Sequence, residues 1–394
     1  MRRSGVADLP LHGGSVPEWL YTRMSAIGRE IMRILVMEHG TSQVLSRLSD
    51  PFWFQALGCV MGMDWHSSGV TTSVIGALKS AVNPIFSDLG IYICGGRGKH
   101  SRKTPQELIE FSSKTGNNGE MLVRASRLTA KVDNSCIIDG YNLYLHSFIV
   151  SKSGEWVVIQ QGMNPKQKMA RRYHWHSANV KSFVDDPHTA IVGKNEGIII
   201  NLSDSMAEKN RKGIVEFLKL HPDIKNNEIK HLVCEKNHNI LQHDIDSRRL
   251  GAIFTLAYEK QFNDFVDAIL LPGVGPRTVQ SLALISEIIY GGPSRFSDPA
   301  RFTFAHGGKD SHPFPVPLKI YDESIQILHN AVEKAKISHS EKLKSLKALH
   351  VLANFIEDNC LPKADVNKII EHENKMSHLY GGMTIYGPSR EKKI

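Results

Sequence analysis

The segment Leu271–Thr278, Leu-Pro-Gly-Val-Gly-Pro-Arg-Thr, constrains the fold of this chain more than any other. Apolar residues recur at helical spacing before it, from Phe262 to Leu270, and after it, from Val279 to Tyr290. Its glycines permit a tight turn with positive φ. Pro276 suits the first turn of the second helix, because proline has a preset φ and no N–H to lose. The sequence therefore predicts two helices joined by a tight hairpin.

The predicted hairpin offers a surface for an anion. Backbone N–H groups of the turn and of the helix start face outward, where an anion can bind them, and Arg277 adds a positive charge. The alternative is a glycine-rich turn inside a helical bundle. We favour the binding interpretation because apolar segments flank the turn and Pro276 begins a helix.

The hairpin resembles the helix-hairpin-helix motif of DNA repair proteins, whose Leu-Pro-Gly-Val-Gly-x-x-Thr core is matched from Leu271 to Thr278. The resemblance implies that the turn holds a DNA phosphate without regard to base sequence. The DNA contacts that it implies at the hairpin are Gly273, Gly275, Arg277 and Thr278.

Composition favours a polyanionic partner. The 394 residues carry a formal net charge of +8, and nucleic acid is the commonest partner of a basic chain. No apolar run has membrane-spanning length, and the N-terminal residues lack the apolar stretch of a signal peptide. The five cysteines form no Cys-x-x-Cys pair, which indicates reduced thiols. We expect a cytoplasmic protein that binds DNA and no membrane; the sequence leaves the oligomeric state open.

The length is sufficient for more than one domain. We predict an α/β N-terminal domain at 1–190, a mixed sheet with helices, that carries the chemistry. A connecting region follows at 191–243. An all-α C-terminal domain at 244–375 contains the helix-hairpin-helix segment and ends with a pair of amphipathic helices. A mobile basic tail is expected at 376–394.

A pair of β runs, 137–150 and 155–162, is predicted to form a β-hairpin. Polar residues interrupt both runs: His146 lies on the first, and a simple register sets Gln161 of the second opposite Tyr144. A half-buried hairpin with one solvated face explains these residues without chemistry. The pair Gln160 and Gln161 does not fit that explanation well, because glutamine is not favoured in strands.

The segment Asp64–Thr72 combines an aspartate, a histidine and four hydroxyl residues. Asp64 and His66 are candidate metal ligands, or an acid and a base beside a phosphate that the hydroxyls hold. In the alternative interpretation a threonine caps the next helix and His66 is a core residue. The sequence does not separate these interpretations.

A glycine-rich loop at 95–105 follows a predicted strand and carries Arg97, Lys99 and Arg102. Flexible cationic loops of this kind bind phosphates, so we favour contact with nucleic acid over a merely solvated loop. The loop lacks the Gly-Lys-Ser/Thr arrangement of a P-loop.

The segment 166–176 interleaves cations with aromatic residues. In the functional interpretation Arg171 and Arg172 neutralise phosphates, while His174 joins a metal or an acid–base pair. The alternative is a solvated basic edge with Trp175 anchored in the core.

A narrower resemblance links the hairpin region to helix-hairpin-helix base-excision glycosylases, which follow the hairpin with a catalytic aspartate. It implies that role for Asp310, on a long loop where Lys309 is a candidate DNA contact. The lyase members carry a lysine where Arg277 stands. Because arginine is not a nucleophile at neutral pH, we expect no Schiff-base chemistry there.

Nearly the whole chain resembles an archaeal and bacterial family known only as domain of unknown function family 763. The blocks that carry this resemblance are 5–14, 64–72, 95–105, 139–141, 160–164, 170–175 and 304–316. The resemblance implies no activity, so the chemistry has to be inferred from the residues.

The leading hypothesis is a DNA-processing nuclease that cleaves phosphodiester bonds in DNA repair. Its candidate catalytic residues are Asp64, His66, Asp139, His146, Gln161 and His174. The cofactor stays open; Mg²⁺, Mn²⁺ or Zn²⁺ held by Asp64, His66 and His174 fits this chemistry. The alternatives are a glycosylase-like enzyme that uses Asp310 and a DNA-binding module without catalysis.

Overall fold

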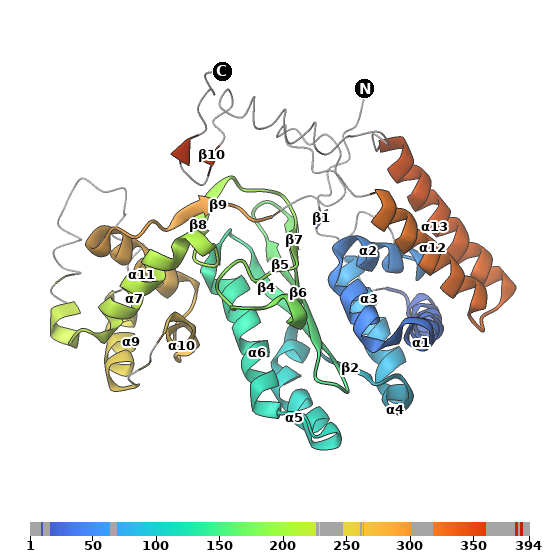
Figure 1. The fold of residues 1–394 in the computed structure, drawn as a ribbon, viewed down its shortest axis with the longest axis horizontal. Coiled ribbons are helices and arrows are strands. Elements are labelled where there is room, and N and C mark those ends of the chain that lie inside the picture. The colour runs from blue at the N-terminus through green and yellow to red at the C-terminus, as the bar shows by residue number, and fades with distance from the viewer. Residues whose placement is uncertain are drawn as a thin grey trace.

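The computed structural model describes residues 9–10, 16–63, 69–225, 228, 247–260, 262, 264–300, 318–359, 383–384 and 387–388. Its central feature is an antiparallel sheet with helices on both faces (Figure 1). The strands run in the order β1-β6-β5-β4-β2, and β7 also pairs with β6. Their bounds are β1 Leu9–Pro10, β2 Ile91–Arg97, β4 Asn142–Ser151, β5 Trp156–Asn164, β6 Met169–His176 and β7 Ala190–Val192.

The predicted β-hairpin forms the middle of this sheet, where β4 and β5 pair antiparallel. The predicted run 137–150 is divided, however, because β3, Ile137–Ile138, leaves the main sheet and pairs with β8. A β-bulge in β4 also shifts the register, so that Gln161 lies opposite Leu145 rather than Tyr144.

Every strand pairing among the described residues is antiparallel, so the expectation of a mixed sheet is wrong. Short turns join β4 to β5 and β5 to β6, whereas a parallel pair needs a long crossover. A smaller sheet has the order β3-β8-β9, and β10 pairs with β11. These strands are β8 Ile198–Asn201, β9 Arg295–Ser297, β10 Met383–Thr384 and β11 Gly387–Pro388.

The N-terminal helices cover one face of the main sheet, and the last described helices pack against these helices (Figure 1). They are α1 Glu18–Ser49, α2 Pro51–Val60, α3 Gly69–Val82, α4 Phe86–Leu89, α12 Leu318–Lys334 and α13 His339–Asn359. Because side chains alternate along a strand, Ile149, Val157 and Ile159 all point to this side and share its core.

Helices α12 and α13 pack against α1 and α2. We predicted that they complete the domain of the hairpin, and their position differs from that prediction. Leu328 and Val332 of α12 and Leu349 of α13 lie in the core of the N-terminal helices. An amphipathic pattern shows which side of a helix is apolar, but not which element that side contacts.

The opposite face is covered by α5, by α6 with the π-helix η3 that continues it, and by the helices around the hairpin. They are α5 Thr104–Thr115, α6 Gly119–Lys131, η3 Val132–Cys136, α7 Glu208–Lys219, α9 Ser247–Lys260, α10 Phe265–Leu270 and α11 Pro276–Tyr290. Phe148, Val158 and Trp175 point to this side and join one apolar core that reaches Val279 and Leu282 of α11. This core places the turn between α10 and α11 beside α6.

Short 3₁₀ helices connect several of these elements. They are η1 Asn83–Ile85, η2 Gly98–Lys103, η4 Ser177–Asn179 and η5 Ser205–Ala207. Of these, η2 belongs to the glycine-rich loop, lies directly before α5 and contacts β2 and β4. Among the described helices none is both long and apolar enough to span a membrane.

Candidate active site

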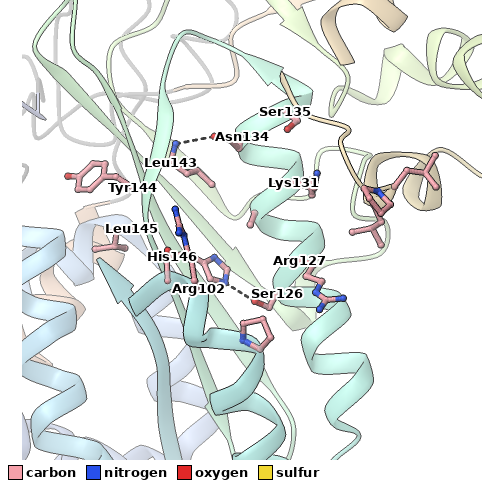
Figure 2. A pocket seen from close by; sticks show the side chains of 17 residues that line it. Arg102, Ser126, Arg127, Lys131, Asn134, Ser135, Leu143, Tyr144, Leu145 and His146 are labelled. Carbon is pink, nitrogen blue, oxygen red and sulfur yellow. Dashed lines mark hydrogen bonds between the residues drawn. The ribbon is translucent and has the colours of Figure 1, made fainter. Parts of the chain in front are cut away.

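A pocket of about 740 Å³ lies between the α10–α11 turn and the sheet (Figure 2). Its volume is typical of ligand sites in proteins. Helix α6, the loop of η2, strand β4 and the turn each contribute to its lining. The described lining residues are Ser101, Arg102, Pro105, Ser126, Arg127, Ala130, Lys131, Asn134, Ser135, Leu143, Tyr144, Leu145, His146, Leu270, Leu271, Pro272 and Gly275.

The lining of the pocket is positively charged. It contains Arg102, Arg127 and Lys131, and none of the described lining residues is acidic. Arg127 and Lys131 lie one helical turn apart on α6, so they project to the same side (Figure 2). Both arginines are exposed, whereas Lys131 is half-buried, and burial lowers the pKa of its ammonium group. Clustered positive charge beside open space favours an anionic ligand.

The α10–α11 turn is anchored by its apolar residues and by Lys131. Leu271 and Val274 are buried, and Lys131 Nζ donates to the carbonyl of Val274. Gly273 has the left-handed φ that we predicted, 85°, but Gly275 is extended with φ −143°, so only the first position requires glycine. Within the described part of the chain, the amides of both glycines donate to no backbone carbonyl. They are therefore available to an anion.

The start of α11 has the predicted form at Pro276, which occupies the first helical turn. Gly275 precedes it without a side chain to cap the helix, so the first amides of α11 have no side-chain partner there. Arg277 is exposed beside them. Thr278 is buried, however, so its side chain does not reach the surface where we expected a DNA contact.

Ser126 and His146 form a hydrogen-bonded pair in the pocket (Figure 2). Ser126 Oγ lies 2.8 Å from His146 Nε2, and His146 Nδ1 lies 2.8 Å from Gln160 Oε1. Gln160 Nε2 donates to Asp133 Oδ2 at 2.5 Å, and Trp175 Nε1 donates to the same oxygen at 3.0 Å. A continuous chain of hydrogen bonds therefore leads from the pocket to a wholly buried carboxyl group.

This chain of hydrogen bonds fixes the tautomer of His146. Because the Trp175 indole N–H can only donate, Asp133 Oδ2 is an acceptor and draws the amide N–H of Gln160 toward it. Gln160 Oε1 then faces His146 and accepts from Nδ1–H, which leaves Nε2 to accept the hydroxyl proton of Ser126.

The imidazole of His146 has the protonation state that a general base needs. Burial lowers the pKa of His146 to about 4, against a weaker opposing effect of the Gln160 hydrogen bond, so the imidazole is neutral at neutral pH. A neutral histidine that accepts from a serine hydroxyl is the arrangement by which proteins activate a serine nucleophile.

Asp133, at the end of the chain of hydrogen bonds, lies in η3 and is fully buried. Its Oδ1 lies 2.5 Å from His188 Nε2. Burial raises the pKa of Asp133, while His188 and the N–H donors of Trp175 and Gln160 oppose the shift. Single π-helical turns within α-helices are enriched at functional sites, and η3 continues α6 directly.

His174 does not join this site, although we expected it in the catalytic set and among the metal ligands. It lies on the opposite face of the sheet, edge-on to Phe54 of α2 with 5.8 Å between ring centroids. Burial lowers its pKa well below the ordinary value, and the nearby Arg172 adds to this effect. His174 therefore belongs to the packed interface between β6 and α2.

Arg171 and Arg172 are wholly buried, so the expectation that they contact DNA is wrong. Arg171 forms ion pairs with Asp139, Nη1–Oδ2 2.7 Å, and with Asp298, Nη2–Oδ2 2.6 Å. Arg172 points to the other face, where Nη1 donates to Gln55 Oε1 at 3.0 Å. Successive side chains of a central strand point to opposite faces, and both faces of β6 are covered by helices and loops.

Asp139 and Gln161 also lie outside the pocket lining. Besides Arg171, the Asp139 carboxylate accepts from the hydroxyl of Tyr173 at 2.7 Å. Burial raises the pKa of Asp139 to about 6 despite the neighbouring guanidinium. Gln161 lies opposite Arg172 in the β5–β6 register and so faces the α2 side. Neither of these residues, which we expected in the catalytic set, lines the pocket with His146.

The remaining predicted residues divide into three groups. Arg102 lines the pocket, while Arg97 and Lys99 are exposed outside its lining. Asp64, His66, Lys309 and Asp310 lie outside the described residues. In the part of the chain that the structure describes, no group of three or more His, Cys, Asp or Glu is placed to hold a metal ion.

Sequence reasoning missed most of the pocket. Ser126 gave no signal, because an isolated serine in a helix has many roles. Arg127 and Lys131 did give one, since cations four residues apart share a helix face. Gln160 and Asp133 become recognisable only when the sheet brings them together with His146.

Comparison with protein families places this chain in one of them. A family model described as "Protein of unknown function (DUF763)" matches residues 5–316, so the chain belongs to this family. Neither the curated proteins nor the solved structures contain a match. The matched range includes all of the described residues that line the pocket.

Proposed function

We propose that the protein binds DNA at the α10–α11 turn and cleaves a phosphodiester bond in the adjoining pocket. The observation that carries this proposal is the content of the pocket. Cationic side chains, the turn and a serine–histidine pair all face one space. A phosphodiester is an anion, so the cationic side chains and the turn would bind it, and the serine–histidine pair would react with it.

Backbone N–H groups and positive charges at the α10–α11 turn account for the proposed binding of DNA. The Gly273 and Gly275 amides and the uncapped start of α11 offer N–H donors to a backbone phosphate. Arg277 is exposed at the same helix start. These groups would contact phosphates and no base edges, so the proposed binding is independent of base sequence. Because it is electrostatic, it weakens as the salt concentration rises.

Cleavage follows from the groups deeper in the pocket. Arg102 and Arg127 supply positive charge to the phosphoryl oxygens, on which negative charge grows in the transition state. Lys131 adds a further charge and joins the turn to α6. His146 supplies the base and Ser126 the hydroxyl that it polarises.

The test is a cleavage assay on labelled single-stranded and duplex DNA, resolved on denaturing gels with EDTA or with divalent ions. The R102E/R127E variant reverses two exposed charges at the pocket. We expect wild-type protein to give bands without alkali and this variant to lose DNA affinity on the order of tenfold or more at moderate salt.

The matched control is K114E/K152E, which changes net charge equally at exposed positions outside the pocket lining. It should bind and cleave like the wild type. Equal losses in both variants would attribute the effect to net charge and contradict the proposal. Binding without bands under any condition would reduce the function to DNA binding.

A further inference from the structure

Both ring nitrogens of His146 are already engaged. Nδ1 pairs with Gln160 and Nε2 with Ser126, each at 2.8 Å. A histidine that activates water must present a basic nitrogen to that water, and here the Ser126 hydroxyl occupies that position. The proton within reach of Nε2 is therefore the hydroxyl proton of Ser126.

From this geometry we propose that Ser126 is the nucleophile and that cleavage passes through a phosphoseryl enzyme. The inference rests on the proposed function and names its chemical route. Ser126 Oγ attacks phosphorus while His146 Nε2 takes the hydroxyl proton. The bond from phosphorus to the leaving sugar oxygen, in line with the attack, breaks, and that oxygen takes a proton from solvent.

The second half of the reaction restores the enzyme. When the leaving strand departs, water enters in line with the bond from phosphorus to Oγ and loses a proton to solvent. The resulting hydroxide attacks phosphorus, the bond from phosphorus to Oγ breaks, and Oγ takes back the proton that His146 Nε2 removed. The sum is hydrolysis of one phosphodiester by one water, with no oxidant, reductant or further reactant.

The surroundings of the pair suit this role. Ser126 lies within α6 and Thr129 bonds to its carbonyl, so the hydroxyl is presented from a rigid element. Arg127 follows it directly and lines the same pocket, to which it adds positive charge. Gln160 and Asp133 are positioning residues, because they act on the reaction by fixing the tautomer of His146.

The experiment traps the intermediate. Labelled DNA is mixed with wild-type protein, the reaction is quenched in acid, and covalent protein–DNA adducts are resolved and mapped by mass spectrometry. In parallel the protein is treated with diisopropyl fluorophosphate, which phosphorylates activated serines. We expect both labels on Ser126. S126A should lose both labels and slow cleavage on the order of 10³-fold while it keeps DNA affinity.

The control is S113A, an exposed serine of α5, which should behave as the wild type in every assay. Cleavage by S126A at the wild-type rate, or an adduct on another residue, would overturn the Ser126 assignment and leave the proposed function intact. If diisopropyl fluorophosphate labelled Ser126 but the protein cleaved no DNA, the proposed function would be wrong. The assignment of Ser126 as an activated nucleophile would then still stand.

Discussion

The buried state of His146 has a direct consequence for stability at low pH. Its folded pKa of about 4 lies below the ordinary 6.5 because burial disfavours the charged ring. Between these values the unfolded chain binds a proton that the folded chain does not, so stability falls as pH drops through this window. From pH 8 to pH 4.5 the loss from this one group is about 2.5 kcal/mol.

The perturbation is H146Q, which removes the titrating ring. Free energies of unfolding from urea titrations at pH 8 and pH 4.5 give the loss for each protein. We expect the loss for H146Q to be smaller than that of the wild type by about 2.5 kcal/mol. His174 is buried in both proteins, so its contribution cancels.

The matched control is H39Q, which removes an exposed histidine of α1. Its acid-induced loss should equal that of the wild type. If H146Q lost as much stability as the wild type over this range, His146 would not be held neutral by the fold. The assignment of a neutral base in the pocket would then be refuted.

The buried ion pairs of Arg171, the turn at Gly273 and the base His146 each give a further prediction. R171M leaves the carboxylates of Asp139 and Asp298 buried without their partner and should lower the free energy of unfolding by about 3–5 kcal/mol. The control R295M removes an exposed ion pair and should lower it by at most about 1 kcal/mol. G273V forces a branched residue to φ 85° and should destabilise the fold by about 1–3 kcal/mol and weaken DNA binding, whereas the helical G251A should not. Measured over pH, cleavage should decline only as pH falls toward about 4, the pKa of His146; a decline centred at 6.5 would contradict this.

The local features of the fold were predictable from the sequence. The helices on both sides of the turn and the β4–β5 hairpin follow from periodicity and turn residues within short segments. The position of α12 and α13 was not predictable, because their apolar faces fit any complementary surface. The cationic and aromatic run at Arg171 and Arg172 fits a surface edge equally well, and only the distant pairings of β6 with β1 and β7 make that strand central.

The candidate site was harder to predict for the same reason. Of the expected catalytic set, His146 lies in the pocket, whereas His174 faces the other side of the sheet. The partners of His146 come from α6 at Ser126, from η3 at Asp133 and from β5 at Gln160. No short pattern links these positions, so a sequence motif could not have revealed them.

The salt dependence of DNA binding tests whether the pocket holds the DNA backbone. The affinity for a short fluorescent duplex would be measured by anisotropy from 50 to 300 mM salt for the wild type, R102A/R127A and K114A/K152A. If both pocket arginines contact phosphates, the slope of log affinity against log salt should fall by about 1.8 in R102A/R127A and stay unchanged in the control. Equal slopes in all three proteins would contradict the claim that the pocket holds the DNA backbone.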